Sequence, residues 1–372
     1  MKFPGIGLLL ALTSLVAAAQ TNGTEKTVSP EVHADGRVTF RVKAPGAREV
    51  AYWGDWMPQQ TSAPMSQDQS GVWSATTGPL QPGLAIYTLT IDGVTTPDPV
   101  NPLIKRRART SASFVDVPGR GDELWAPGNV PHGVVEVRWE KSAVTGDTRA
   151  FYVYTPPDYR ANATKRYPVV YLLHGNNDTA AGWTDAGKAN FIIDNLVARK
   201  KAAPMILVMP WGHAVPYDGP QTNNTAVFER YLLDEVLPRV EAEYRVAPGR
   251  DNRAIVGLSM GGGHALQIGL GHTDIFGSVA AFSFAIPSGF EHRFKSLLDD
   301  PEGTNAKMRL IWLGCGRQDP AFPRNRGLAE LLASRHVRNT FEEVEGMHNY
   351  TVWRKLLGDV APLLFKEGAA RR

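Results

Sequence analysis

The sequence contains a single cysteine, Cys315, so the chain cannot form an internal disulfide. One thiol also excludes a CxxC redox site and a zinc site built from several cysteines. No HExxH pair and no cluster of histidines and carboxylates at metal-ligand spacing occurs, which argues against a metalloenzyme. We therefore expect a fold held by its hydrophobic core, with neither a metal nor a cofactor.

The sequence also has little excess of either positive or negative charge. The 40 lysines and arginines nearly balance the 37 aspartates and glutamates, which leaves a net charge of +3 without a strongly charged block. This balance disfavours a nucleic-acid-binding protein. The 36 glycines and 27 prolines suit turns and ordered loops rather than long coiled coils.

Long apolar runs are missing beyond the first twenty residues, so no later segment could span a membrane. Lys2, the apolar run 6–16 and the small residues 17–19 follow the order of a secretory signal peptide. We predict a signal peptide over residues 1–19, and an exported protein, periplasmic or extracellular, that does not insert into a membrane. A retained N-terminal anchor is the alternative, but the run is short for it.

Short alternating segments predict a small β-sandwich domain over residues 28–116. A stretch rich in proline, glycine and arginine, 95–131, has weak periodicity and fits a linker or wrapping segment, with the linker proper over 117–131. Within it, we expect Lys105-Arg106-Arg107 to be a solvated face rather than an anion site. The expected strands are 37–43, 49–53, 71–76 and 85–91.

After Pro131 apolar strands alternate with amphipathic helices, which predicts an α/β domain over residues 132–368. Its first two strands resemble a hairpin, and the rest should form a mainly parallel sheet with helices on both faces. The expected strands are 134–139, 151–154, 169–173, 206–209, 254–257, 278–282, 310–313 and 340–344. The expected helices are 189–201, 226–244 with a kink at Pro238, 260–270, 324–334 and 350–365.

The sharpest motif is Gly257-Leu258-Ser259-Met260-Gly261, a G-x-S-x-G between an apolar strand and a helical segment. Small residues on both sides let strand and helix approach while the Ser259 hydroxyl projects from the end of the sheet. The free N–H groups of the following helix favour negative charge beside it. The context predicts that Ser259 is a catalytic nucleophile.

A serine hydroxyl becomes a good nucleophile only when a base takes its proton and an acidic residue orients that base. Candidates for both follow Ser259 in the chain, in the order Ser, Asp, His. Asp319 comes after the strand 310–313, and His348 lies between the strand 340–344 and the last helix. We predict that His348 is the general base and acid and that Asp319 orients it. Asp300 and Glu345 are alternative acids in less suitable positions, and no other histidine of this domain combines a late position with a strand-to-helix loop.

An oxyanion hole should use the backbone N–H of Met260, the residue after the nucleophile, and an amide from an earlier loop. The loop after Leu173 begins with His174-Gly175, and Gly175 allows the next amide, that of Asn176, to turn toward the site. We expect His174 to hold this loop rather than to act in catalysis.

With these residues in place, residues 131–364 resemble the feruloyl esterase and esterase D-like group of carbohydrate esterase family 1. The resemblance also rests on Val153-Tyr154-Thr155-Pro156-Pro157 and Tyr167-Pro168-Val169-Val170-Tyr171-Leu172-Leu173-His174-Gly175, with Arg149 and Trp183. It implies an α/β-hydrolase fold and metal-free ester hydrolysis through an acyl-enzyme, commonly on feruloyl or acetyl groups of plant xylan.

The first domain is similar to carbohydrate-binding module family 48, an immunoglobulin-like module that also precedes enterochelin esterase-type hydrolases. The matching stretches are Val38-Thr39-Phe40-Arg41-Val42, Trp53-Gly54-Asp55-Trp56 and Asp98-Pro99-Val100-Asn101-Pro102. Trp53, Trp56 and Trp73 could stack on sugar rings, although aromatics of a small sandwich more often form its core. The domain could equally pack over the catalytic cleft and shape it.

The loop 211–224 is rich in turn formers and should line the pocket. The candidate contacts for an aromatic acyl group are Trp183, Trp211, Tyr217 and Phe284, and they are equally candidates for ordinary packing.

The leading hypothesis is an exported serine esterase that releases ferulate or related hydroxycinnamates from plant xylan or its oligosaccharides. An acetylxylan esterase and a siderophore (enterochelin-type) esterase are alternatives with the same chemistry. A carbohydrate-binding protein with a silent hydrolase-like domain is a fourth, but the intact Ser, Asp and His set argues against it. The sequence assigns no oligomeric state.

Overall fold

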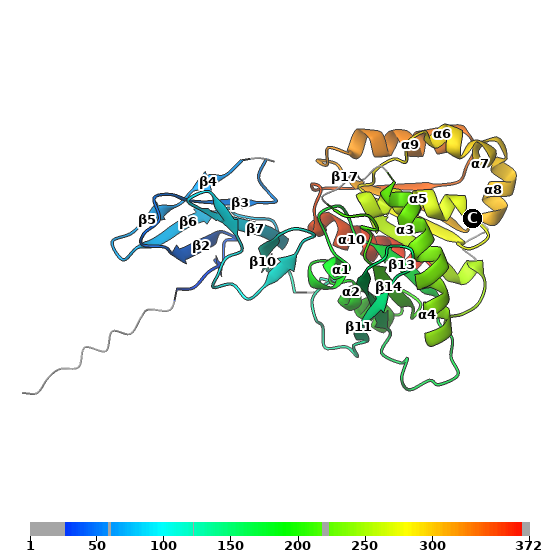
Figure 1. Cartoon of the computed structure of the whole chain (residues 1–372), viewed down its shortest axis with the longest axis horizontal. Coiled ribbons are helices and arrows are strands. Elements are labelled where there is room, and N and C mark those ends of the chain that lie inside the picture. Colours follow the sequence, from blue (N-terminus) through cyan, green and yellow to red (C-terminus); the bar gives the residue numbers. More distant parts are fainter. Residues whose placement is uncertain (1–26, 59–60, 122, 218–222, 367–372) are drawn as a thin grey trace, which may run out of the picture.

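The computed structural model describes residues 27–58, 61–121, 123–217 and 223–366. Two antiparallel sheets near the N-terminus, together called the N-terminal module, lie beside a larger part built on one long sheet (Figure 1). The predicted signal peptide, residues 1–19, falls outside the described residues. Within the described ranges, no helix has both the length and the apolar character needed to cross a bilayer.

The N-terminal module comprises strands β1 to β10. One sheet has the order β1-β2-β6-β5, and the other has the order β4-β3-β7-β10-β9 with β8 paired to β7. Side chains from both sheets meet in a shared core that includes Phe40, Tyr52 and Tyr87. The strands are β1 (Glu31–Val32), β2 (Val38–Lys43), β3 (Val50–Gly54), β4 (Ala63–Pro64), β5 (Ser66–Gln67), β6 (Val72–Thr77), β7 (Gly83–Ile91), β8 (Val94–Thr96), β9 (Ile104–Arg106) and β10 (Ser111–Val117).

The structure confirms the four strands expected in this module and corrects the reading of 95–131 as a linker or wrapping segment. Its first part contributes β9 and β10, and β10 lies inside the second sheet between β7 and β9. The strand signal was weak because β9 is only three residues long and β10 contains two serines and an aspartate. Pairing with its neighbours, rather than local propensity, makes this segment a strand.

The larger part is built on an eight-stranded sheet of order β11-β12-β14-β13-β15-β16-β17-β18, called the main sheet. β11 and β12 form the expected hairpin, β12 is antiparallel to β14, and the remaining pairs are parallel. Continuous apolar runs suit the inner strands because both faces are covered. The strands are β11 (Val134–Lys141), β12 (Thr148–Thr155), β13 (Val169–Leu173), β14 (Ile206–Pro210), β15 (Arg253–Leu258), β16 (Ser278–Phe282), β17 (Leu310–Gly316) and β18 (Thr340–Val344).

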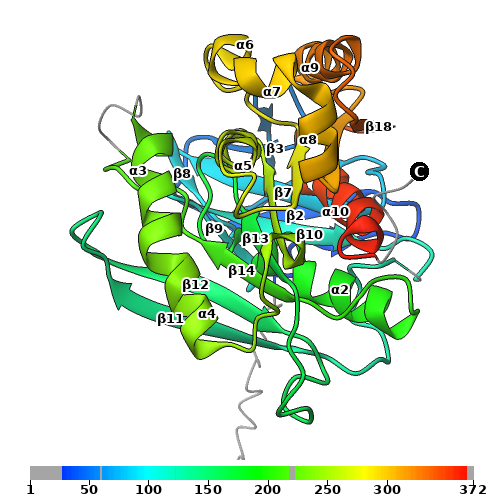
Figure 2. The same ribbon diagram turned by 90° about the vertical axis from the view of Figure 1, so that its right-hand side faces the viewer.

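Helices cover both faces of the main sheet (Figure 2). One face packs against α1, α2 and α10, and the other packs against α3, α4, α5, α7 and α9. The principal helices are α1 (Gly182–Asp185), α2 (Ala189–Ala198), α3 (Asn224–Arg230), α4 (Leu237–Glu243), α5 (Met260–Gly271), α9 (Phe322–Ser334) and α10 (Tyr350–Val360). The sequence did not suggest α1, nor three further short helices, α6 (Phe290–Arg293), α7 (Lys295–Asp299) and α8 (Pro301–Lys307).

A π-helical segment precedes Pro238, at the place where the sequence predicts a kink. Residues Tyr231–Val236 are π-helical, and Pro238 lies in the first turn of α4 directly after them. A proline lacks the N–H that a helix interior requires. The hydrogen bonding departs from the α-helical pattern in the π-helical segment immediately before this proline.

The N-terminal module and the main-sheet part share one hydrophobic cluster. Leu84 and Ile86 of β7 and Phe114 of β10 pack with residues of α10 such as Trp353. These module side chains alternate with those of the module's own core, because successive residues of a strand point to opposite faces. Two polar contacts reinforce the junction: the Thr351 hydroxyl donates to the Leu84 carbonyl at 3.0 Å, and Arg354 donates to Asp116 at 2.8 Å.

Candidate active site

Ser259 lies between the end of β15 and the start of α5, at the edge of the main sheet where the parallel strands end. Its φ is +51°, a conformation that side-chain-bearing residues seldom adopt. A Cβ at Gly257 would strike the Gly261 carbonyl, and one at Gly261 would strike the His174 carbonyl. The glycines of the G-x-S-x-G motif therefore permit a strained turn that raises the Ser259 hydroxyl above the sheet.

The structure brings Ser259, His348 and Asp319 together. His348 follows β18 and Asp319 follows β17, so both loops open at the same edge of the sheet as Ser259. His348 Nε2 lies 3.0 Å from Ser259 Oγ, and His348 Nδ1 lies 2.8 Å from Asp319 Oδ2. An Nδ1–H donated to Asp319 leaves Nε2 free to accept the serine proton.

Asp319 is well placed to remain ionised. Its side chain is almost fully buried, and its second carboxylate oxygen accepts the Ala321 amide at 2.8 Å. Burial alone would raise the pKa of this carboxyl, but the hydrogen bond and charge of His348 together with the amide hold it below its usual range. A carboxylate that is charged at neutral pH can stabilise a protonated imidazole.

The two amides predicted for an oxyanion hole are both available. Met260 is the first residue of α5, and Asn176 follows Gly175 in the loop after β13. A Cβ at Gly175 would come within 3.1 Å of Ser259 Cβ, so this loop passes close to the serine. Among the residues that the structure describes, neither amide N–H donates a hydrogen bond. Their role stays a prediction.

His174 holds the loop after β13, as expected. Its side chain is buried, its Nδ1 lies 2.8 Å from the Gly175 carbonyl, and its Nε2 accepts the Gly212 amide at 2.9 Å. Burial lowers the pKa of His174, and an uncharged imidazole can donate at one nitrogen while it accepts at the other. The residue thus ties the loop after β13 to the loop after β14.

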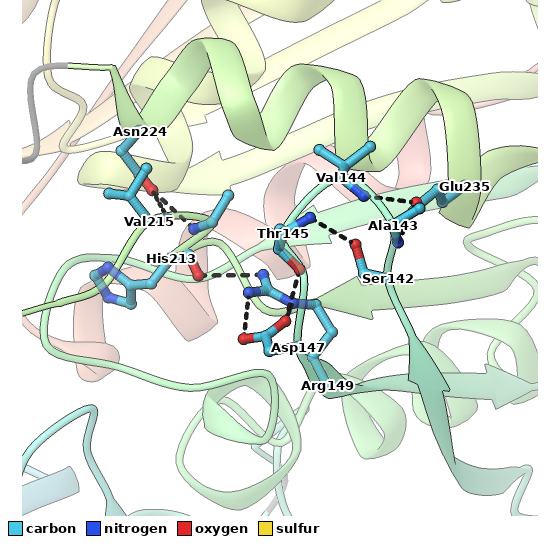
Figure 3. Close-up of polar contacts among 11 residues, drawn as sticks. Ser142, Ala143, Val144, Thr145, Asp147, Arg149, His213, Val215, Asn224 and Glu235 are labelled. Atoms are coloured by element: carbon cyan, nitrogen blue, oxygen red, sulfur yellow. Dashed lines mark hydrogen bonds and ion pairs between the residues drawn. The ribbon is translucent and has the colours of Figure 1, made fainter.

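That second loop is anchored by a polar network around Arg149 and Asn224 (Figure 3). The buried Arg149 guanidinium makes two bonds of 2.8 Å to Asp147 and donates to the His213 carbonyl at 3.2 Å. Asn224, at the start of α3, accepts the Ala214 amide at 2.8 Å and donates to the Gly212 carbonyl at 3.0 Å. These bonds fix residues 212–214 beside the site.

Two cavities lined by described residues meet at Ser259. The first, of about 540 Å³, lies between α3, α5 and the loop after β16. The second, of about 240 Å³, is the one that contains His348. Residues that line the first include Asn176, Asn224, Met260, His264 and Ile286, and residues that line the second include Trp53, Asp55, Arg107, Asn176, His348 and Trp353.

The aromatic candidates for substrate binding have different surroundings, and Phe284 is buried in a hydrophobic cluster. Trp183 is fully buried, donates from Nε1 to the Leu173 carbonyl at 3.0 Å, and packs on Phe282 and Tyr350. This corrects the expectation that Trp183 contacts substrate, because the indole belongs to the core. Trp211 and Tyr217 are partly exposed, and Arg109 lies 4.7 Å from the centre of the Tyr217 ring. Their contact with substrate stays a prediction.

The basic segment 105–107 is a solvated face only in part, because Arg106 is exposed whereas Lys105 is not. Lys105 is buried and lies 2.9 Å from the buried carboxylate of Asp178. The Tyr350 hydroxyl donates to the other oxygen of Asp178 at 2.6 Å. Burial alone would raise the pKa of Asp178, but the charges of Lys105 and His174 together with the Tyr350 hydrogen bond hold this pKa below its usual range. This network, which the sequence did not indicate, joins β9 to the loop after β13 and to α10.

Comparison with known protein families fits this geometry. A family described as "Putative esterase" matches residues 142–363, which include Ser259, Asp319 and His348. The chain belongs to this esterase family. The matched range begins just before β12, so it leaves out the N-terminal module.

The curated proteins that resemble this chain include two that are named as esterases. The endo-1,4-beta-xylanase/feruloyl esterase of Xylanibacter ruminicola is 30% identical over 344 residues, which is 91% of this chain but 46% of that protein. Esterase Rv1288 of Mycobacterium tuberculosis is 33% identical over 149 residues, which is 39% of this chain and 31% of that protein. The chain thus spans less than half the length of either relative.

Solved structures share the fold. A ferulic acid esterase has 28% identity and a TM-score of 0.55 over 64% of this chain and 98% of its own. The enterobactin esterase of Shigella flexneri has 18% identity and a TM-score of 0.65 over 88% of this chain and 92% of its own. At 18% identity, the similarity to the enterobactin esterase concerns the fold alone. The matched region covers 88% of this chain, which is more than the main-sheet part contains, so it also includes residues of the N-terminal module.

Proposed function

We propose that this protein is a serine carboxylic-ester hydrolase that releases ferulate or related hydroxycinnamates from feruloylated plant xylan or its oligosaccharides. The observation that carries the reaction type is the contact of Ser259 with His348 and of His348 with Asp319. The hydroxycinnamate substrate is supported by the relative named as a xylanase and feruloyl esterase, which matches across most of this chain.

In the first half-reaction, Ser259 Oγ attacks the ester carbonyl carbon while His348 Nε2 takes the hydroxyl proton. The carbonyl oxygen becomes an oxyanion, which accepts hydrogen bonds from the Met260 and Asn176 amides. Each such donor typically accelerates the reaction about 10²- to 10³-fold. When the ester C–O bond breaks, His348 returns its proton to the departing alcohol, and the acyl group remains on Ser259.

In the second half-reaction, water takes the place of the alcohol. His348 removes a proton from the water, the hydroxide oxygen attacks the acyl carbon, and the Ser259 oxygen leaves with the proton that His348 returns. The acid is released and the serine is regenerated. Asp319 stays ionised throughout and stabilises the imidazolium that forms twice in each cycle.

We further infer that the N-terminal module is an immunoglobulin-like sandwich related to carbohydrate-binding module family 48, and that the chain is exported. The first inference is supported by the two antiparallel sheets that share one core. The second is supported by the charged, apolar and small residues in the order of a signal peptide at positions 1–19.

The test of the substrate is release of ferulate and of acetate, measured side by side with the purified full chain. Methyl ferulate and feruloylated arabinoxylan oligosaccharides supply the first acid, and acetylated xylan supplies the second. We expect ferulate release that exceeds acetate release. Acetate release alone would replace the proposal by an acetylxylan esterase, and release of neither acid would overturn it.

Asp319→Asn tests the third member of the site. An amide can present its NH₂ to His348 and hold the wrong tautomer, so we expect kcat for methyl ferulate to fall about 10³- to 10⁴-fold with little change in KM. The matched control is Asp274→Asn, in the turn between α5 and β16. Near wild-type turnover by Asp319→Asn would remove this residue from the catalytic set.

A further inference from the structure

The strand β11 forms one outer border of the main sheet (Figure 2). It pairs with β12 along all eight of its residues, and no described residue outside that ladder hydrogen-bonds to its backbone. In an antiparallel pair, the backbone groups of alternate residues point away from the partner strand. The outer edge of β11 therefore presents open N–H and C=O groups, which are a template for a further strand.

One face of this edge strand is apolar and open. Trp139 is 68% exposed and Val137 is 45% exposed. Both point to the same face as the partly buried Val135, because the side chains of a strand alternate between its two faces. The residue opposite Trp139 on β12 is the small Ala150, which covers little of the indole. A strand added beside β11 would find apolar side chains to pack against on this face.

The opposite face of β11 carries charges of alternating sign, Glu136, Arg138 and Glu140. Arg138 lies 2.5 Å from Glu243 of α4, and Glu140 lies 3.5 Å from Arg239 of the same helix. The Arg138 side chain is nevertheless 39% exposed, so its guanidinium can contact a further carboxylate. Alternating charges make this face complementary to a second copy of itself that runs in the opposite direction.

The side chains select a register for such a pair. Residues directly opposite each other in an antiparallel pair share a face. A twofold axis at Arg138 would place this arginine opposite its own copy, which is unfavourable. An axis at Val137 places Val137 opposite Val137 and Trp139 opposite Val135 on the apolar face. On the charged face it places Arg138 opposite Glu136 twice, so every one of these pairs is apolar or of opposite charge.

Other pairings fit less well. A twofold axis at Trp139 would place Val137 opposite the charged Lys141 of the second copy. The other border strand of the main sheet, β18, is five residues long and carries the adjacent acids Glu342 and Glu343. No large apolar side chain of β18 is exposed. The complementary edge of the main sheet is therefore β11.

We propose that a second copy of this chain binds along β11 and continues the main sheet across a twofold axis at Val137. The interface is isologous, because both copies use the same strand. It joins the two main sheets through backbone hydrogen bonds, with Trp139 packed on Val135 and Arg138 paired with Glu136 between the copies. This inference is independent of the proposed esterase function.

The test measures the mass of the purified full chain by sedimentation equilibrium, from low to high micromolar concentrations. We expect the mass to rise from that of one chain to that of two. Val137→Lys places two lysines opposite each other at the axis and should weaken the association by about tenfold or more, because the like charges repel. Val94→Lys is the matched control: Val94 is 67% exposed on β8, and its replacement should leave the association unchanged.

A pair of charge variants tests the register. Arg138→Glu places two carboxylates opposite each other, and Glu136→Arg places two guanidinium groups opposite each other, so each variant alone should remain a single chain. An equimolar mixture restores both opposite-charge pairs between unlike chains and should associate like wild type. Mixing does not change contacts within either chain, such as that of Arg138 with Glu243, so recovery would have to arise between the chains.

A wild-type chain that stays a single copy at every concentration would overturn the inference. So would a dimer that Val137→Lys leaves intact, because its interface would lie elsewhere. A mixture of the two charge variants that does not associate would overturn the proposed register and with it the inference. Thermal unfolding of each variant accompanies these measurements, and the mixture gives the answer if Val137→Lys lowers Tm.

Discussion

Ser259→Ala is expected to lower kcat for methyl ferulate by about 10⁴- to 10⁶-fold, because no other group can form the acyl-enzyme. His348 would remain beside the vacant hydroxyl position but would have no nucleophile to activate. The Met260 and Asn176 amides would remain, so some acceleration over the uncatalysed rate should persist. Stopped assays with long incubation measure this residual rate against a no-enzyme blank.

Two further measurements make the result specific to Ser259. Ser296→Ala, on the exposed surface of α7, removes the same hydroxyl elsewhere and should retain wild-type kcat. An alkyl phosphonate ester should add once to the wild-type chain, as seen by intact-mass spectrometry, and should not add to Ser259→Ala. A Ser259→Ala enzyme with more than a few per cent of wild-type kcat would rule out the proposed mechanism.

Lys105→Met is expected to destabilise the folded chain by about 3–5 kcal/mol, the usual cost of removing one partner of a buried ion pair. Lys105 and Asp178 have side chains only 6% and 5% exposed, so the carboxylate would be left in the protein interior without its cation. The Tyr350 hydroxyl and the Thr179 amide would still donate to it, but two neutral hydrogen bonds do not replace a charge. Urea unfolding at pH 7 measures the loss.

The same pair gives stability a defined pH dependence. Because the folded-state pKa of Asp178 lies below its unfolded value, the pair contributes stability that is complete above the unfolded value of about 4 and is lost as the pH falls through the folded value. The difference between wild type and Lys105→Met should therefore be largest near neutral pH and shrink under acid conditions. A difference independent of pH would show that packing, rather than charge, is lost.

Lys355→Met provides the matched control on stability. Lys355 lies 2.9 Å from Asp359 on the same helix, but both side chains are substantially exposed. Exposed pairs of this spacing contribute only about 0.3–0.5 kcal/mol. Equal losses in the two lysine variants would contradict the assignment of Lys105 to a buried, structurally important pair.

Local patterns were sufficient for the elements that position the proposed catalytic groups. The apolar runs before Ser259, Asp319 and His348 predict β15, β17 and β18, all of which the structure contains. Parallel strands place their carboxyl ends at one edge of a sheet, so the three loops were expected to converge. The geometry of the nucleophile turn could also be anticipated, because it depends on glycines adjacent in sequence.

Local sequence patterns could not predict features that depend on contacts between residues far apart in the chain. Lys105 looks like a surface lysine within a basic run, and only the folded chain places it against Asp178. Trp183 looked like a candidate contact for substrate because its position in the core depends on Phe282 and Tyr350. Trp53, which is partly exposed, could not be separated by composition from Trp73, which is buried in the module core, since both lie in similar alternating segments.

The helix α10 begins two residues after His348, with the Asn349 side chain accepting the Val352 amide at its first turn. The same helix contacts the N-terminal module through two side chains: Thr351 donates to the Leu84 carbonyl, and Arg354 donates to Asp116. The N-terminal module therefore cannot be exchanged for another module as if it were an independent domain. A transplanted module would have to bring a surface complementary to α10, so the two parts are expected to diverge together and to be engineered as a single unit.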